Sequence, residues 1–138
     1  MPLVTARGRF RMGDVMLKGV DHVDLVVSDM DDAIAFYTEK LGLTLRYDGR
    51  PDGGLKHTFL GNAEGSFVAL EEDPVGTVRE PPLRGHLAFA VEDVEAARKE
   101  LDKRGVEITG ERTDEHGRAK SYYFAGPDGI RLEIYGPL

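Results

Sequence analysis

The sequence predicts an α+β fold in which two tandem βαβββ modules form a cupped mixed sheet. The first observation is an internal repeat, because residues 21–29 (DHVDLVVSD) recur 64 positions later as residues 85–93 (GHLAFAVED). The second is that each copy shows strand-like alternation on either side of one helical stripe. The third is a proline-rich stretch, residues 74–82, between the two copies. Duplicated units of this size indicate modules that must cover each other's apolar surface.

The composition indicates one globular domain without attraction to nucleic acid or membrane. A chain of 138 residues with 41% hydrophobic and 31% charged residues is typical of such a domain. Eighteen basic residues against 25 acidic ones give a net charge of −7, so neither nucleic acid nor an anionic membrane is an expected partner. The lack of cysteine excludes disulfides, thiolate ligands and a cysteine nucleophile. Without a membrane-length or signal-type apolar run, a cytoplasmic location is expected.

The expected organisation is an N-terminal extension, residues 1–17, followed by a single domain, residues 18–138. The extension contains arginines and glycines without periodicity, which favours a loose or edge-packed arm. The domain consists of modules 18–73 and 84–138, which the proline-rich linker joins.

In the first module, residues 20–27 alternate as a strand with His22 and Asp24 on the same face. Asp29 is a suitable N-cap for the following helix, and Gly42 ends it. Three further strands are expected at residues 43–47, 55–60 and 66–71.

The second module repeats this order with a strand at residues 85–91 and a helix that begins after Asp93 and ends before Gly105. Its further strands are expected at residues 106–112, 121–124 and 130–135. Each module then has a helix on one face of its sheet and an open second face. That open face must be covered by the sibling module or by another chain.

Two histidines and one glutamate are the principal candidates for chemistry. His22 and His86 occupy equivalent positions of the repeat, and Glu133 lies near the end of the second copy. Alternation places all three away from the apolar faces of their strands. Two imidazoles and one carboxylate leave positions open on a divalent metal ion, as a catalytic site requires. A single strand histidine is usually structural, but the joint occurrence of the three favours a metal site.

Two further polar residues have two interpretations each. Asp24 shares a strand face with His22, so it is either a catalytic base or orienting group, or a salt-bridge partner of Arg131. His116 lies in a loop rich in glycine and acidic residues, where it is either solvated or a proton shuttle.

Tyr123 is a further catalytic candidate, and Tyr135 and His57 are candidates for substrate binding. Tyr123 and Tyr135 are able to donate hydrogen bonds to a substrate oxyanion, although core packing explains them equally well. His57 either lines the open face or is an exposed or structural residue.

The two copies resemble the two halves of the vicinal oxygen chelate superfamily, which contains glyoxalase I, extradiol dioxygenases, fosfomycin-resistance thiol transferases and bleomycin-resistance proteins. The resemblance covers about residues 19 to 136 and rests on residues 21–23, 29–37 and 41–43 in the first half, and on residues 85–89, 93–94, 123–124 and 127–133 in the second. It implies the glyoxalase/bleomycin resistance/dioxygenase fold.

The resemblance also implies a divalent metal held by His22, His86 and Glu133. Fe²⁺ or Mn²⁺ is favoured, with Zn²⁺ and Ni²⁺ as alternatives. Glyoxalase I has a fourth ligand, a glutamate on the fourth strand, but the repeat places Ala69 there. A small shift along the strand would offer Glu71 or Glu72 instead.

By this resemblance the protein is a metal-dependent enzyme that chelates a small oxygenated substrate, most similar to a dioxygenase. His116, Tyr123 and Glu133 satisfy the shortest spacing of the extradiol signature, with departures from it at Tyr122 and Gly126. The superfamily also implies a homodimer, in which His22 of one chain would join His86 and Glu133 of its partner.

Three alternatives stay open within the resemblance. In a fosfomycin-type thiol transferase, Lys120, Ser121 and Arg131 would surround a dianionic phosphonate. A glyoxalase-like lyase would use the same metal ligands. A metal-free drug-binding protein of the bleomycin-resistance type would need none of them.

Overall fold

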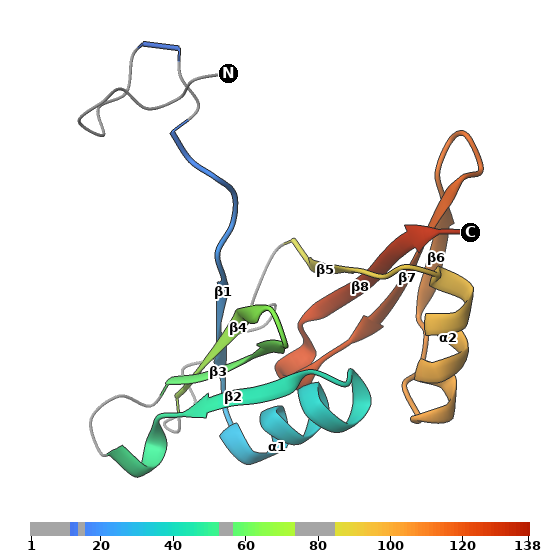
Figure 1. Cartoon of the computed structure of the whole chain (residues 1–138). Helices are drawn as coiled ribbons and strands as arrows, with labels where there is room; N and C mark the ends of the chain where they lie inside the picture. Colours follow the sequence, from blue (N-terminus) through green and yellow to red (C-terminus); the bar gives the residue numbers. More distant parts are fainter. Residues whose placement is uncertain (1–11, 14–15, 53–56, 74–84) are drawn as a thin grey trace.

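The computed structural model describes residues 12–13, 16–52, 57–73 and 85–138, which form two sheets side by side (Figure 1). The proline-rich linker and most of the N-terminal extension lie outside the described residues. The first module contains β1 (Val23–Val27), α1 (Met30–Ala35), β2 (Thr44–Asp48), β3 (His57–Asn62) and β4 (Gly65–Glu72). The second contains β5 (Leu87–Ala90), α2 (Val94–Lys103), β6 (Gly110–Thr113), β7 (Ala119–Ala125) and β8 (Arg131–Pro137).

The two sheets have the same topology, so the prediction of two βαβββ modules is confirmed. Their strand orders are β1-β4-β3-β2 and β5-β8-β7-β6, with the outer first strand parallel to its neighbour and the other pairs antiparallel. Among the described residues the strands of one sheet do not pair with those of the other, so the chain forms two mixed sheets rather than one.

Both helices begin where the sequence predicts. Asp29 accepts a hydrogen bond from the N–H of Asp32, and Asp93 accepts one from the N–H of Ala96, so both aspartates are N-caps. The first helix ends at Gly42, whose φ of 76° is one that glycine adopts without strain.

The first helix does not stay an α-helix up to this glycine. It widens into a π-helical turn, Phe36–Lys40, beyond Ala35. Within that turn the hydroxyl of Thr38 donates to the carbonyl of Ile34 at 2.7 Å, a contact that competes with regular helical bonding.

The first strand of each module begins later than the alternation predicts. β1 starts at Val23 and β5 at Leu87, so His22 and His86 each lie just ahead of a strand. β6 also starts later, at Gly110, because Val106 turns back onto α2 and its N–H donates to the carbonyl of Leu101.

The helices cover one face of each sheet and leave the other open, as predicted. α1 packs on β4 and α2 on β7 and β8 (Figure 1). The strand residues beneath the helices are buried: Leu25, Val27, Val68 and Leu70 in the first module, and Tyr122, Phe124, Leu132 and Ile134 in the second. Alternation therefore directs the intervening, largely polar residues to the open faces.

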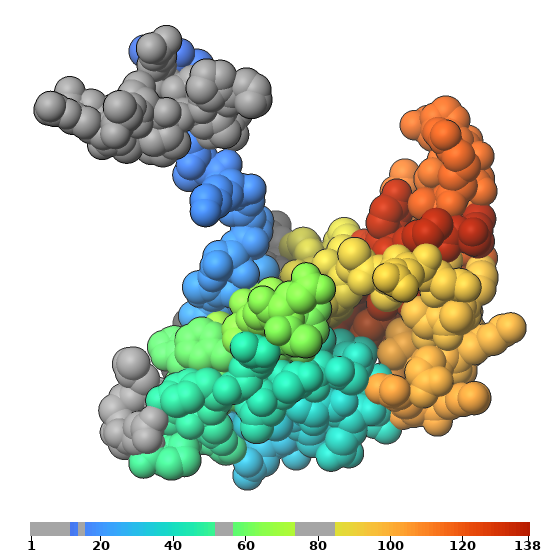
Figure 2. All heavy atoms as spheres, viewed as in Figure 1, coloured from blue at the N-terminus to red at the C-terminus, as the bar shows by residue number. Residues whose placement is uncertain are grey.

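Residues 16–22, ahead of β1, and the hairpin between β6 and β7 project from the body of the molecule (Figure 2). Among the described residues, no helix has the length and apolar character needed to cross a membrane.

Candidate functional site

The open face of the second sheet holds a close pair between His86 and Glu133. The Nε2 atom of His86 lies 2.6 Å from Oε1 of Glu133, and the hydroxyl of Ser121 donates to Oε2 of the same carboxylate. Glu133 is only 6% exposed although its side chain is ionisable. A buried carboxylate is costly unless it is paired and hydrogen bonded, and these two side chains supply that compensation.

Strand register explains why these three side chains meet. Glu133 of β8 is opposite Ala88 of β5 on one side and Tyr123 of β7 on the other. Ser121 lies two residues before Tyr123 and therefore on the same face. His86 precedes Ala88 by two residues and so extends from the same face of β5. Ala88 itself presents only a methyl group, so it leaves the imidazole a path to the carboxylate.

An aromatic ring and a guanidinium border this pair. The ring of Tyr123 meets that of His86 edge to face, with 5.7 Å between the centroids. The guanidinium of Arg131 lies over the ring of Tyr123, 4.3 Å from the ring centroid. Tyr135, across the strand pair from Ser121, is 46% exposed on the same face. The open face thus combines a buried carboxylate, an imidazole and a nearby positive charge.

Lys120 does not lie with Ser121, which corrects its expected place beside a substrate. Successive residues of β7 point to opposite sides, and the ammonium of Lys120 lies 3.1 Å from Glu111 and 3.7 Å from Glu95. Contact with the Tyr122 hydroxyl and with Glu111 raises the pKa of Lys120. Lys120 therefore belongs to the ion pairs on the α2 side of the sheet.

Two other expected site residues are also away from the His86–Glu133 pair. His116 is exposed in the turn between β6 and β7, at the tip of the projecting hairpin. His22 is exposed at the start of β1, where its Nδ1 lies 2.9 Å from the carboxylate of Asp21. The rings of His22 and Phe59 meet edge to face at 6.3 Å, which places the imidazole over the open face of the first sheet.

The three expected metal ligands are therefore split between two sheets. His86 and Glu133 lie on the second sheet, whereas His22 lies on the first. Among the described residues, these three side chains do not converge within one chain, since the one group of three ligating residues with mutual distances below 4.8 Å has other members.

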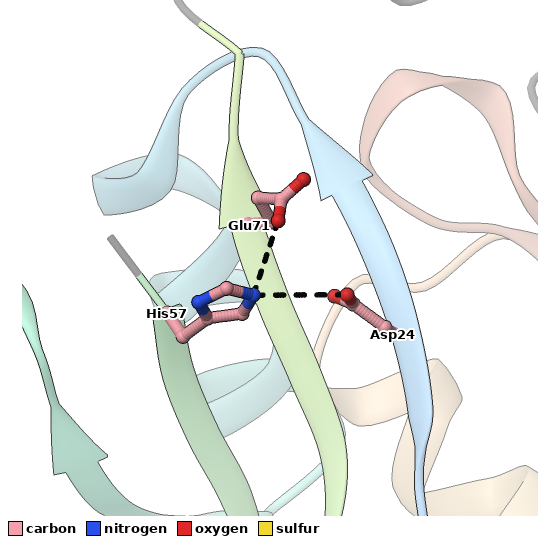
Figure 3. A group of neighbouring side chains, drawn as sticks. All are labelled: Asp24, His57 and Glu71. Carbon is pink, nitrogen blue, oxygen red and sulfur yellow. Dashed lines mark ion pairs between the residues drawn. The ribbon is translucent and has the colours of Figure 1, made fainter. Parts of the chain in front are cut away.

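That group consists of Asp24, His57 and Glu71, on the open face of the first sheet (Figure 3). The Nε2 atom of His57 lies 3.0 Å from Oε1 of Glu71 and 3.7 Å from Oδ2 of Asp24. In this chain Asp24 therefore pairs with a histidine, and Arg131, its expected alternative partner, lies over Tyr123 on the other sheet.

Sequence reasoning missed the part that Glu71 plays in this group. His57 and Glu71 are direct cross-strand partners in β3 and β4, and that register depends on a turn and on bulges that no sequence pattern specifies. Glu72 faces the other side of the sheet, where its carboxylate accepts a hydrogen bond from the N–H of Met30 at the start of α1.

Comparisons with known proteins agree with this architecture. Residues 19–134 match the family model of the glyoxalase/bleomycin resistance protein/dioxygenase superfamily. The chain is 32% identical to the uncharacterized protein YwkD of Bacillus subtilis, over 88% of this chain and 98% of YwkD. It is 33% identical to the glutathione transferase FosA of Serratia marcescens, over 87% of this chain and 82% of FosA.

A solved structure shows the same likeness. The crystal structure of the glyoxalase family protein from Enterococcus faecalis aligns with a TM-score of 0.69 at 28% identity, over 88% of this chain and 99% of that one. Because the family model spans nearly the whole chain, the protein belongs to the glyoxalase/bleomycin resistance protein/dioxygenase superfamily.

Proposed function

We propose that this protein is a divalent-metal-dependent enzyme that chelates a small, anionic, oxygenated substrate at His86 and Glu133. One observation carries the proposal: an imidazole nitrogen is aimed at a buried carboxylate, 2.6 Å away, on the open face of a sheet. Buried ionisable groups with a specific partner, placed on an open surface, are typical of functional sites.

The donor set fits a first-row divalent ion. One imidazole nitrogen and one carboxylate oxygen suit Fe²⁺, Mn²⁺, Zn²⁺ or Ni²⁺. Ser121 holds the second oxygen of Glu133 and so acts as an outer partner that orients the ligand. When bound, such an ion supplies Lewis-acid chemistry to two oxygens of a substrate.

The third ligand in this proposal is His22 of a second copy of the chain. The contact between Nδ1 of His22 and Asp21 leaves Nε2 as the ligating nitrogen. Both open faces also carry exposed apolar side chains that a second copy would cover: Val26 and Tyr47 on the first sheet, and Tyr135 on the second. A two-fold dimer places the first sheet of each chain over the second sheet of the other and creates two equivalent sites.

Two residues of the second sheet define the substrate class. The guanidinium of Arg131, over the Tyr123 ring, attracts an anionic oxygen and is able to bind it with two hydrogen bonds. The phenol of Tyr123 lies beside His86 and supplies a donor to a second oxygen. Together they favour a small molecule that carries a negative charge next to its chelating oxygens.

Among the candidate reaction classes, group transfer to the chelated substrate and a lyase reaction on it are better supported than dioxygenation. The similarity to a glutathione transferase supports transfer, with 33% identity over most of both chains. The dioxygenase alternative stays a prediction, and the identity of the metal together with oxygen uptake distinguishes it from the other two.

The experiment is elemental analysis of untagged protein purified anaerobically without chelator, alongside the His86→Ala and Glu133→Gln variants. The matched control is His116→Ala, which removes an exposed histidine outside the pair. Circular dichroism establishes that each variant is folded.

The proposal expects about one first-row metal per chain at this site in the wild type and in His116→Ala, and one metal per chain fewer in both site variants. Fosfomycin with thiols, methylglyoxal with glutathione, and catechol with oxygen are then the assays for transferase, lyase and dioxygenase. A wild type that holds no metal and takes up none of the four ions would overturn the proposal and leave drug binding as the better account.

A further inference from the structure

We propose a second divalent-cation site, formed by Asp24, His57 and Glu71 on the open face of the first sheet (Figure 3). It shares no residue with the His86–Glu133 pair or with His22. The proposal therefore stands independently of the proposed function.

The distances between the ligating atoms fit one cation. Nitrogen and oxygen ligands lie roughly 2.0 to 2.2 Å from Zn²⁺ and similar ions, so two ligands of one ion are roughly 3.0 to 3.5 Å apart. Nε2 of His57 lies 3.0 Å from Oε1 of Glu71 and 3.7 Å from Oδ2 of Asp24. All three atoms lie within 4.8 Å of one another, so small side-chain rotations would bring them to one ion.

Three adjacent strands hold these side chains. Asp24 is on β1, Glu71 on the central strand β4 and His57 on β3, so each ligand comes from a different part of one sheet. Ala69 is in register with Asp24 on one side and with Phe59 on the other. Its methyl group leaves open the space across which Asp24 and His57 face each other. Ligands on rigid strands need little reordering to bind an ion.

The second module shows that the fold does not require this group. It has the same register but places Ala88, Ser121 and Tyr135 at the equivalent positions, and these residues do not offer a comparable ligand set. The sheet of the second module forms without such a cluster, so folding alone does not account for it in the first.

The charge of the group also favours a cation. Two carboxylates whose oxygens lie within 4.8 Å of each other repel. A divalent ion would balance both carboxylates. One imidazole and two carboxylates favour Mn²⁺, Fe²⁺, Co²⁺ or Zn²⁺ over Mg²⁺ and Ca²⁺, which prefer oxygen ligands alone.

The test is a titration of untagged, metal-free protein with Co²⁺, followed by visible absorption and by equilibrium dialysis. The wild type is compared with His57→Ala and Glu71→Gln, which remove one ligand each, and with His86→Ala. The controls are His116→Ala and Glu107→Gln, which replace an exposed histidine and an exposed glutamate of the second module. Far-ultraviolet circular dichroism confirms that the variants are folded.

The proposal expects two Co²⁺ per chain in the wild type and in both controls, and one in His57→Ala and in Glu71→Gln. The affinity of the lost site is expected to fall at least about tenfold, since even outer-shell partners contribute that much. His86→Ala is expected to keep the Co²⁺ held by His57.

The outcomes separate this inference from the proposed function. One Co²⁺ per chain that is lost in His57→Ala but kept in His86→Ala supports the second site and counts against the first. The opposite pattern overturns the second site and leaves the first intact. Identical stoichiometry and affinity in the wild type, His57→Ala and Glu71→Gln likewise overturn the inference.

Discussion

Ser28 and Asp128 join the two modules: the carboxylate of Asp128 accepts hydrogen bonds from both the backbone N–H and the hydroxyl of Ser28, at 3.0 and 2.6 Å. Ser28 precedes α1, and Asp128 lies in the turn before β8, 100 residues further along the chain. Asp128 has a φ of 61°, a conformation that aspartate tolerates better than most residues. Burial and, to a lesser extent, the charge of Asp128 raise the pKa of the nearby Tyr37.

Asp128→Ala is expected to lower the free energy of unfolding by about 1 to 3 kcal/mol, because it removes two acceptor contacts and leaves alanine in a left-handed conformation. Chemical denaturation at fixed protein concentration measures this. Asp128→Gly, which removes the contacts without the backbone cost, is expected to lose less stability. Equal stability of the wild type and Asp128→Ala would show that the contact does not join the modules.

Ser121→Ala is expected to weaken metal binding at the proposed site by about 10- to 100-fold without abolishing it, because the hydroxyl orients Glu133 and is not itself a ligand. Competition with a chromophoric chelator measures the affinity. Ser66→Ala, a serine on the first sheet, is the matched control. An unchanged affinity in Ser121→Ala would contradict the role assigned to the hydroxyl.

Mixed dimers test the sharing of the proposed site between two chains. His22→Ala and Glu133→Gln homodimers are each expected to bind no metal at that site. A dimer with one chain of each kind keeps one complete set, His22 from the Glu133→Gln chain and His86 with Glu133 from the His22→Ala chain. Co-expression with two affinity tags, removed before analysis, isolates the mixed dimer.

One metal per mixed dimer at this site, lost on His86→Ala in the His22→Ala chain, is the expected result. The same substitution in the Glu133→Gln chain is the control and leaves the metal in place. A mixed dimer without metal would argue against sites that two chains share.

Asp48 offers a prediction on pH. Arg50 holds its carboxylate through hydrogen bonds from Nε at 3.0 Å and from Nη2 at 2.7 Å, and these lower the pKa of Asp48 from 3.8 to about 2. A carboxyl whose pKa is lower in the folded than in the unfolded state stabilises the fold at pH values above its unfolded-state pKa. This contribution is lost as the pH falls from about 4 through 2.

The gain is below about 1 kcal/mol, because the pair is partly exposed to solvent. In Arg50→Gln, the pKa of Asp48 is expected to return toward about 3.9. A carbon-13 NMR titration of the Asp48 carboxyl measures the change. An Asp48 pKa still near 2 in the variant would contradict the role of Arg50.

Much of the fold was predictable because its signals are local. The caps at Asp29 and Asp93 and the stop at Gly42 depend on a few neighbouring residues each, and the helices begin and end there. The predicted strand starts at residues 20 and 85 were less accurate, since alternation continues into segments that are not paired in the described sheets.

The site was predictable only in part. Alternation correctly placed Glu133 and Asp24 on open faces, because side chains alternate with a period of two along any strand. The same rule placed Lys120 and Ser121 on opposite faces, so their expected role together was wrong. The meeting of His57 with Glu71 was not predictable, because it follows from how two hairpin strands align.

By itself, the sequence determined the two homologous modules, the helix that follows the first strand of each, and which residues of a strand share a face. Only the tertiary structure decided which strands lie side by side, and therefore that His86 meets Glu133 and that His57 lies between Glu71 and Asp24. The physical reason is that the face on which a strand side chain lies and the cap of a helix both depend on consecutive residues. Register between strands is instead set by turns, bulges and packing over the whole sheet.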